Sequence, residues 1–256
     1  MTRFLLYFGL LSFLAWPAWA QEATDANLIT AIDVSGSIRA ADEHLELEGM
    51  AAAVLDPRFL QAIARGRHGR IGFVAFTWAN GEFVSLVPWT RIASASDAAL
   101  VAARLRSARG KSVAGYVMAA AGKRRMRIPG HRPWRVGQAT DVSEAIEHAI
   151  EVASASPFAS RRNVINVCAN GIDNIGGQPS RARAAAVAKG ITVNGLILGE
   201  RENAGDVAAW YRDHVEAGPG SFVIEVRDFE DIASAMLAKF VLELAAASPR
   251  PPRAPS

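Results

Sequence analysis

Short apolar runs rich in β-branched residues recur along the chain, and stretches with helical spacing lie between them. The runs are almost continuously apolar instead of alternating with polar residues, which is typical of strands buried on both faces of a parallel sheet. They cover residues 27–34, 70–76, 163–168, 191–198 and 221–226. Strands that alternate with helices predict an α/β fold in which a doubly wound, mostly parallel sheet carries helices on both faces.

Two of the intervening stretches carry a clear helical signal. In residues 228–244 the apolar side chains keep a helical period, and in residues 140–153 they fall on one face. The second stretch opens with Thr140 and Asp141, and Glu144 follows Asp141 at the spacing of a capping box. Both stretches therefore predict helices, the second with a defined first turn.

One connection is predicted to be a hairpin instead of a crossover. Asn80-Gly81 separates two apolar runs, and this pair is the strongest short signal for a tight turn between antiparallel strands. We expect an antiparallel strand over about residues 83–87 at the edge of the sheet, ended by Pro88.

The two ends of the 256-residue chain differ from the middle in composition. Residues 1–20 place one Arg before an apolar run and end in the small-x-small pattern AWA, which predicts a signal peptide that is cleaved on export. A retained membrane anchor is the alternative, because the run is almost long enough to span a bilayer. With the signal removed, we expect a periplasmic or secreted protein without a transmembrane segment, a domain over residues 27–245 and a disordered Pro-rich tail over residues 247–256.

The net charge of +3 hides an uneven distribution. Ten of the 28 Lys and Arg residues, and none of the 25 Asp and Glu residues, fall between Leu100 and Thr140. This basic insertion, about residues 107–139, is predicted to be either a solvated loop or a surface for an acidic protein, an anionic glycan or an anionic lipid. Nucleic acid is not expected as a partner, because an exported protein rarely meets it. The side chains predicted to contact a partner are Arg124, Arg125, Arg127, Arg132 and Arg135.

Oxygen-bearing side chains follow the first buried strand. Asp33, Ser35 and Ser37 alternate with other residues at its carboxyl end, where open α/β sheets bind their ligands. Oxygen ligands at short spacing suit a hard divalent cation, Mg²⁺ before Mn²⁺ or Ca²⁺. A cation held mainly by neutral hydroxyls keeps excess positive charge and therefore attracts an anion. The alternative is that the two serines, with Thr140 and Asp141, only cap helices.

The arrangement of these residues resembles the metal-ion-dependent adhesion site of von Willebrand factor A (vWA) domains. The resemblance rests on Asp33-x-Ser35-x-Ser37 after a strand, Thr140 just before a helix, and a third loop, "NVCANGIDN", after the next strand. More narrowly, "AIDVSGSI", "INVCANGIDNIGGQP" and "ITVNGLIL" resemble the exported bacterial vWA-like group DUF1194 over roughly residues 27–245.

The resemblance implies a six-stranded sheet with the antiparallel strand at its edge. It also implies that the hydroxyls of Ser35, Ser37 and Thr140 bind the cation, that Asp33 acts directly or through water, and that an acidic partner completes the shell. The third loop departs from the group, because Asn170 stands where an Asp is typical. An amide removes one negative charge, although its carbonyl oxygen is still a ligand, and Asp173 or Asp141 would have to compensate.

We therefore predict a non-enzymatic, exported binding module that engages an acidic protein through a cation at Asp33, Ser35, Ser37, Thr140 and Asn170. A metal-free interaction scaffold that uses the basic insertion and a hydrolase of unrecognised type are the alternatives. The chain shows no GxSxG nucleophile elbow, no phosphate-binding loop with its Lys and Ser or Thr, and no histidines at metal-ligand spacing. Its single cysteine, Cys168, excludes an intramolecular disulfide.

Overall fold

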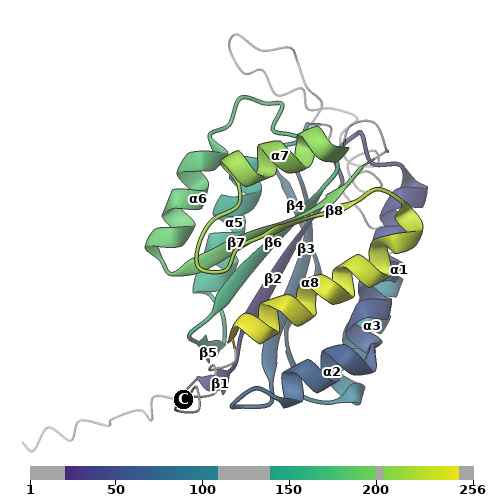
Figure 1. The fold of residues 1–256 in the computed structure, drawn as a ribbon, viewed down its shortest axis with the longest axis vertical. Coiled ribbons are helices and arrows are strands. Elements are labelled where there is room, and N and C mark those ends of the chain that lie inside the picture. Colours follow the sequence, from purple (N-terminus) through teal and green to yellow (C-terminus); the bar gives the residue numbers. More distant parts are fainter. Residues whose placement is uncertain (1–20, 109–138, 200–203, 248–256) are drawn as a thin grey trace, which may run out of the picture.

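A computed structural model describes residues 21–108, 139–199 and 204–247 (Figure 1). Its centre is a six-stranded sheet with the order β4-β3-β2-β6-β7-β8. Every neighbouring pair in this sheet is parallel except β3–β4, which is antiparallel and lies at one edge. The predicted α/β class, the doubly wound order and the antiparallel edge strand are confirmed. The strands are β2 (Asn27–Asp33), β3 (Ile71–Ala79), β4 (Glu82–Ile92), β6 (Asn163–Ala169), β7 (Ile191–Leu198) and β8 (Val223–Val226).

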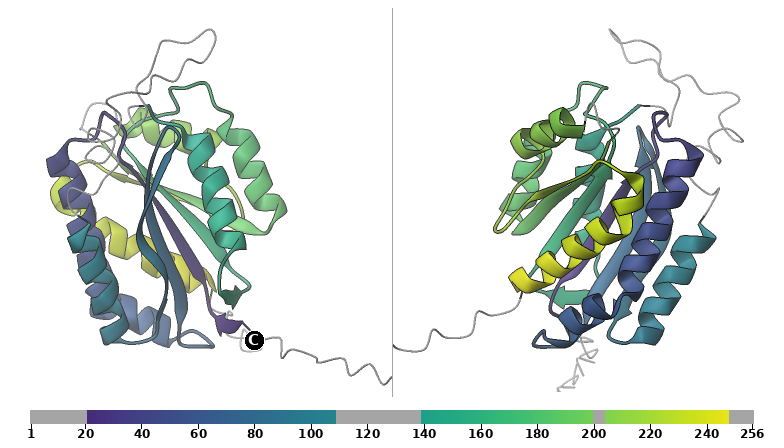
Figure 2. Two further views of the ribbon diagram at one scale, coloured as in Figure 1. Left: turned by 180° about the vertical axis from the view of Figure 1, so that it is seen from behind. Right: turned by 45° about the vertical axis from the view of Figure 1, so that its right-hand side comes forward.

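Helices cover both faces of the sheet, as the two views of Figure 2 show. One face packs against α1 (Ala40–Leu55), α2 (Pro57–Ala64), α3 (Ala95–Ser107) and α8 (Ile232–Ala247). The other packs against α5 (Val142–Ser154), α6 (Pro179–Ala188) and α7 (Ala204–His214). Consecutive side chains of a strand point to opposite faces, so each central strand contributes to two separate apolar cores.

The hairpin forms as predicted, but its second strand is longer than predicted. Gly81 occupies the turn with a φ of 76°, a conformation that favours glycine. The strand β4 continues through Pro88 to Ile92, so the prediction that Pro88 ends it is wrong. Pro88 is tolerated because it is exposed on the edge strand, next to a register shift between Phe73 and Ala75 of β3.

The two predicted helices form with small changes at their starts. Asp141 is the N-cap of α5, and its carboxylate accepts the Glu144 N–H at 3.0 Å. The Glu144 carboxylate does not close a capping box but accepts the Gly81 N–H at 2.8 Å, which ties the hairpin to α5. The last helix opens with a short 3₁₀ turn (Phe229–Asp231) before α8, which ends at Ala247. Residues 248–256 lie outside the described residues, so the predicted tail stays a prediction.

Two features of the fold had no counterpart among the sequence predictions. A two-stranded parallel sheet, β1 (Glu22–Thr24) with β5 (Phe158–Ser160), lies near the start of β2. A fully buried ion pair between Lys239 and Glu243 of α8 bonds to Asn166 of β6, and the Glu243 carboxylate also accepts from the Asn194 amide of β7 at 2.8 Å. These polar contacts fix α8 on the sheet, because a displaced helix would leave buried charges without partners.

Candidate functional site

The loop after β2 brings Ser35 and Ser37 to the carboxyl end of the sheet without using them as helix caps. Helix α1 begins at Ala40, and its N-cap residue, Arg39, makes no side-chain capping bond. Thr140 is not a cap either, because the cap of α5 is Asp141. The hydroxyls of Ser35, Ser37 and Thr140 are therefore not used in capping, and the capping alternative holds only for Asp141.

The hydroxyls of Ser35, Ser37 and Thr140 lie together with the Asn170 amide, and we call these four side chains the hydroxyl cluster. The Ser35 Oγ is 3.0 Å from the Thr140 Oγ1 and 3.3 Å from the Ser37 Oγ. The Ser37 hydroxyl donates to the Asn170 Oδ1 at 2.8 Å. Three loops that are far apart in sequence thus converge, although Asn170 is engaged with Ser37.

Asp33, the last residue of β2, lies buried behind this cluster. Its Oδ1 accepts the Ser35 N–H at 2.8 Å, whereas its Oδ2 is buried without a hydrogen-bond partner in the described part of the chain. Burial raises the pKa of Asp33 to about 7, and hydrogen bonds from Ser35 work against this rise. An unpaired carboxylate oxygen in a buried position is costly unless a proton or a cation satisfies it.

The third loop holds Thr140 through its backbone. The Thr140 N–H donates to the Asn174 Oδ1 at 2.9 Å, and the Asn174 N–H donates back to the Thr140 carbonyl at 3.1 Å. Asn80 of the hairpin fixes the preceding residue in the same way, because its Oδ1 accepts the Ala139 N–H at 2.9 Å. Sequence reasoning missed Asn174 and Asn80; the only available signal was the tendency of Asn to bond to nearby backbone in turns.

The two acids that could have compensated for Asn170 are engaged elsewhere. The Asp173 Oδ1 accepts N–H groups from the next turns of its own loop, and its Oδ2 accepts the Val142 N–H at 3.1 Å. Asp141 caps α5. Burial, followed by the nearby negative charges, raises the pKa of Asp141 to about 6. Asp33, in contrast, is joined to the hydroxyl cluster by its bond from the Ser35 N–H.

The chemistry of these ligands fits a hard cation. All the side-chain ligands are oxygens, and the Asp33 Oδ2 is a buried acceptor that lacks a donor among the described residues. Across the described ranges, no three His, Cys, Asp or Glu side chains converge closely enough to hold a metal ion. A cation at this position would therefore depend on neutral hydroxyl and amide oxygens with the Asp33 carboxylate behind them. The predicted partner-binding arginines (Arg124, Arg125, Arg127, Arg132, Arg135) lie outside the described residues.

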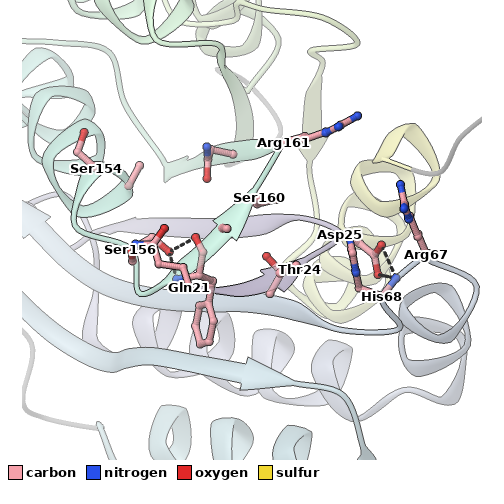
Figure 3. Close-up of a pocket in the computed structure, with 14 residues that line it drawn as sticks. Gln21, Thr24, Asp25, Arg67, His68, Ser154, Ser156, Ser160 and Arg161 are labelled. Atoms are coloured by element: carbon pink, nitrogen blue, oxygen red, sulfur yellow. Dashed lines mark hydrogen bonds between the residues drawn. The ribbon is translucent and has the colours of Figure 1, made fainter. Parts of the chain in front are cut away.

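A separate pocket of about 800 Å³ lies beside the β1–β5 sheet, near the amino ends of the central strands (Figure 3). Its polar groups mainly hold the local backbone: the Gln21 amide donates to the Ser156 carbonyl at 3.0 Å, and Asp25 accepts the His68 N–H at 2.9 Å. None of the predicted site residues lines it, so it does not belong to the hydroxyl cluster.

A model of the family described as "Protein of unknown function (DUF1194)" matches this chain over residues 23–128 and 119–248. The chain belongs to this family. A search of curated proteins found no match. Within the described residues, no helix of this DUF1194 chain combines the length and the apolar character needed to cross a membrane.

Solved structures resemble the DUF1194 chain in fold. Proximal thread matrix protein 1 from the mussel byssus aligns with a TM-score of 0.51 and 14% identity over 88% of this chain and 48% of that one. A second structure of that protein, "with zinc occupied MIDAS motif", aligns with a TM-score of 0.51 and 16% identity, over 88% and 46% of the two chains. The pilus adhesin SpaC from Lactobacillus rhamnosus GG gives 0.50 and 10%, over 87% and 31%.

The DUF1194 chain thus spans about half or less of the length of these structures. At such low identity the likeness concerns the fold alone. Together with the family match, it confirms the predicted vWA-like architecture.

Proposed function

We propose that this DUF1194 chain is an exported, non-enzymatic binding module that presents a divalent cation of the Mg²⁺ type to an acidic side chain of a protein partner. The observation that supports it most directly is the convergence of the Ser35, Ser37 and Thr140 hydroxyls in front of Asp33. Three hydroxyls from two separate loops lie within hydrogen-bond distance of a neighbour at the carboxyl end of the sheet, which is where α/β folds bind their ligands.

In this proposal each residue of the site has a distinct task. The Ser35 and Thr140 side chains are buried and would provide the inner oxygens, while Ser37 is exposed and would face the partner. Asp33 provides the negative charge, directly or through a water molecule, and the Asn170 Oδ1 holds the Ser37 hydroxyl in place. With Asp33 as the one carboxylate of this proposed shell, a bound divalent ion keeps net positive charge, which a carboxylate of the partner would neutralise.

Export and the partner class rest on the predicted signal in residues 1–20 and on the fold. The likeness to an adhesin and to a thread matrix protein supports a binding role, whereas the zinc-occupied MIDAS motif is a property of the mussel protein alone. We further propose that the basic insertion steers the same acidic partner toward the cation, with anionic glycan or lipid as the other ligands it would suit. Deletion of residues 107–137 is then expected to lower the association rate and its salt dependence; an unchanged rate would contradict this role.

Calorimetric titration of the purified domain with Mg²⁺, Mn²⁺ and Ca²⁺ tests the cation site. We expect saturable binding to the native chain, and loss of most of the binding in Ser35→Ala and Thr140→Val, which each remove one hydroxyl ligand. Ser234→Ala is the matched control, because Ser234 is an exposed residue of α8. All variants should keep the native circular dichroism spectrum.

Equal binding by the control and the two site variants would contradict the proposal. No saturable binding to the native chain would favour the metal-free scaffold, in which the hydroxyls of the cluster satisfy one another. A pull-down from a periplasmic extract, with and without chelator, extends the test to the partner: a partner retained equally in chelator does not use the cation.

A further inference from the structure

A pocket of about 510 Å³ adjoins the hydroxyl cluster on the side of the β3–β4 hairpin. Its walls are the hairpin turn, the first turns of α5 and the loop that leads into α6, which lie at one end of the sheet in Figure 1. The ionisable side chains of its lining are Asp141, Glu144, Glu147 and Arg181. Among the described residues the lining thus holds three acids and one base, and we call it the acidic pocket.

The acidic pocket and the proposed cation site are connected by consecutive residues of the chain. Asp141 follows Thr140, and the hairpin residue Asn80 holds Ala139 by hydrogen bonds in both directions, 2.9 and 3.1 Å long. Glu144 is fixed at the pocket wall by the Gly81 N–H. The pocket and the hydroxyl cluster therefore share residues 139–141, which the hairpin holds by hydrogen bonds.

The pocket also contains a buried hydroxyl without a partner. Ser143 is only 9% exposed, and its Oγ accepts or donates no hydrogen bond within the described residues. This oxygen faces Gly177: a Cβ placed on Gly177 would overlap the Ser143 Oγ and lie 2.8 Å from the Asp173 Oδ2. Gly177 does not have a positive φ, so its backbone does not require glycine. The place of a side chain at Gly177 is instead taken by these two oxygens, so a larger residue there would displace them.

A ligand of this pocket has to supply hydrogen-bond donors. Buried polar groups normally have hydrogen-bond partners, and ionised carboxylates can only accept hydrogen bonds. The Ser143 hydroxyl and the carboxylates beside it therefore favour a ligand group rich in N–H. Lys and Arg side chains carry donors alone together with the matching charge.

We propose that the acidic pocket binds a Lys or Arg side chain of the same protein partner whose carboxylate completes the cation's shell. This inference rests on the proposed function and narrows the partner: its contact segment carries an acid and a base close together. Since an extended chain advances about 3.3 Å per residue and Asp141 is the immediate neighbour of Thr140, the base is expected within about four residues of the acid.

A displayed random-peptide library, panned on the immobilised protein in Mg²⁺ and eluted with chelator, tests the proposed function and this inference separately. Peptides enriched in Asp or Glu and released by chelator are the result expected from the cation site. Lys or Arg enriched within about four positions of that acid is the result expected from the acidic pocket. Peptides that stay bound in chelator, or the absence of any enriched peptide, would contradict both the proposed function and this inference. Enrichment of acids without a nearby base would overturn only the inference about the acidic pocket.

A second experiment measures the contact with one selected peptide and with its Lys→Gln or Arg→Gln counterpart. The affinity of each peptide is measured for the native protein and for the variant Glu144→Gln/Glu147→Gln. Glutamine at 144 keeps an acceptor for the Gly81 N–H. We expect the native protein to bind the charged peptide about three- to tenfold more tightly than its neutral counterpart, and the variant to lose this preference.

Ser143→Ala is expected to reduce the preference more weakly, because it removes one hydroxyl acceptor and no charge. Glu151→Gln is the control outside the pocket: it removes one charge from an exposed acid near the other end of the same helix, and it should keep the preference in full. A preference that survives unchanged in Glu144→Gln/Glu147→Gln, or that is lost equally in Glu151→Gln, overturns the proposal.

Discussion

Replacement of Asp33 by Asn should make the cation-free protein less sensitive to pH while abolishing cation binding. The carboxyl of Asp33 is fully buried, its Oδ2 has no partner in the described residues, and burial raises its pKa from 3.8 to about 7. The folded protein therefore keeps a proton on Asp33 over a pH range in which the unfolded chain has lost it. In that range the folded state binds more protons, so the free energy of unfolding falls as the pH rises.

The size of the effect follows from the two pKa values. A difference of about three units, at 1.36 kcal/mol per unit, means that native stability loses about 4 kcal/mol between about pH 4 and about pH 7 and then levels off. Asn cannot ionise, so Asp33→Asn lacks this loss. The stability of the variant relative to the native chain should thus rise by about 4 kcal/mol across the same window. The variant also affects Glu46. Burial is the main cause of the raised pKa of Glu46 and the Asp33 charge is the next, so Asp33→Asn removes the second cause.

Urea unfolding in chelator at a series of pH values from about 4 to 8 measures the effect. Asp213→Asn, an exposed substitution on α7 with the same change of charge, is the control and should follow the native profile. Added Mg²⁺ at 100 times its dissociation constant should then stabilise the native protein by about 2.7 kcal/mol and leave Asp33→Asn unaffected. A constant difference between the native protein and Asp33→Asn at all pH values would refute the reasoning, because it would mean that the buried carboxyl titrates normally.

Three further substitutions have defined expectations. Asn170→Asp restores a second negative charge to the hydroxyl cluster, so calorimetry should show Mg²⁺ binding about tenfold tighter; unchanged or weaker binding would contradict a ligand position near the cation. Lys239→Met leaves the Glu243 carboxylate buried without its ion-pair partner and should cost about 3–5 kcal/mol in urea unfolding, whereas Lys239→Met/Glu243→Leu should recover part of this loss. Gly49→Ala would place a Cβ into Ile232 at the contact between α1 and α8 and should cost about 1–3 kcal/mol; a neutral result would mean that the helices separate freely.

Local sequence determined the buried strands, the hairpin and the start of α5. Continuous β-branched runs gave the buried parallel strands, because strands covered on both faces tolerate few polar positions. Asn80-Gly81 determined the hairpin, since the turn needs a residue such as Gly81 at a φ of 76°. Asp141 determined the start of α5. The end of β4 was not determined locally: whether Pro88 interrupts a strand depends on its position at an exposed edge beside a register shift.

Tertiary structure alone decided which polar groups meet. The sequence indicated that Asp33, Ser35, Ser37 and Thr140 sit at strand ends, but the 3.0 Å approach of Ser35 to Thr140 joins residues 105 positions apart and depends on the sheet order. The same holds for three other features: the Asp33 Oδ2, which has no partner within the described part of the chain, the Ser143 hydroxyl that faces Gly177, and the buried Lys239–Glu243 pair. The sequence shows which side chains are able to form hydrogen bonds. The packing of the folded chain decides which of these side chains are buried away from water and which protein groups become their partners.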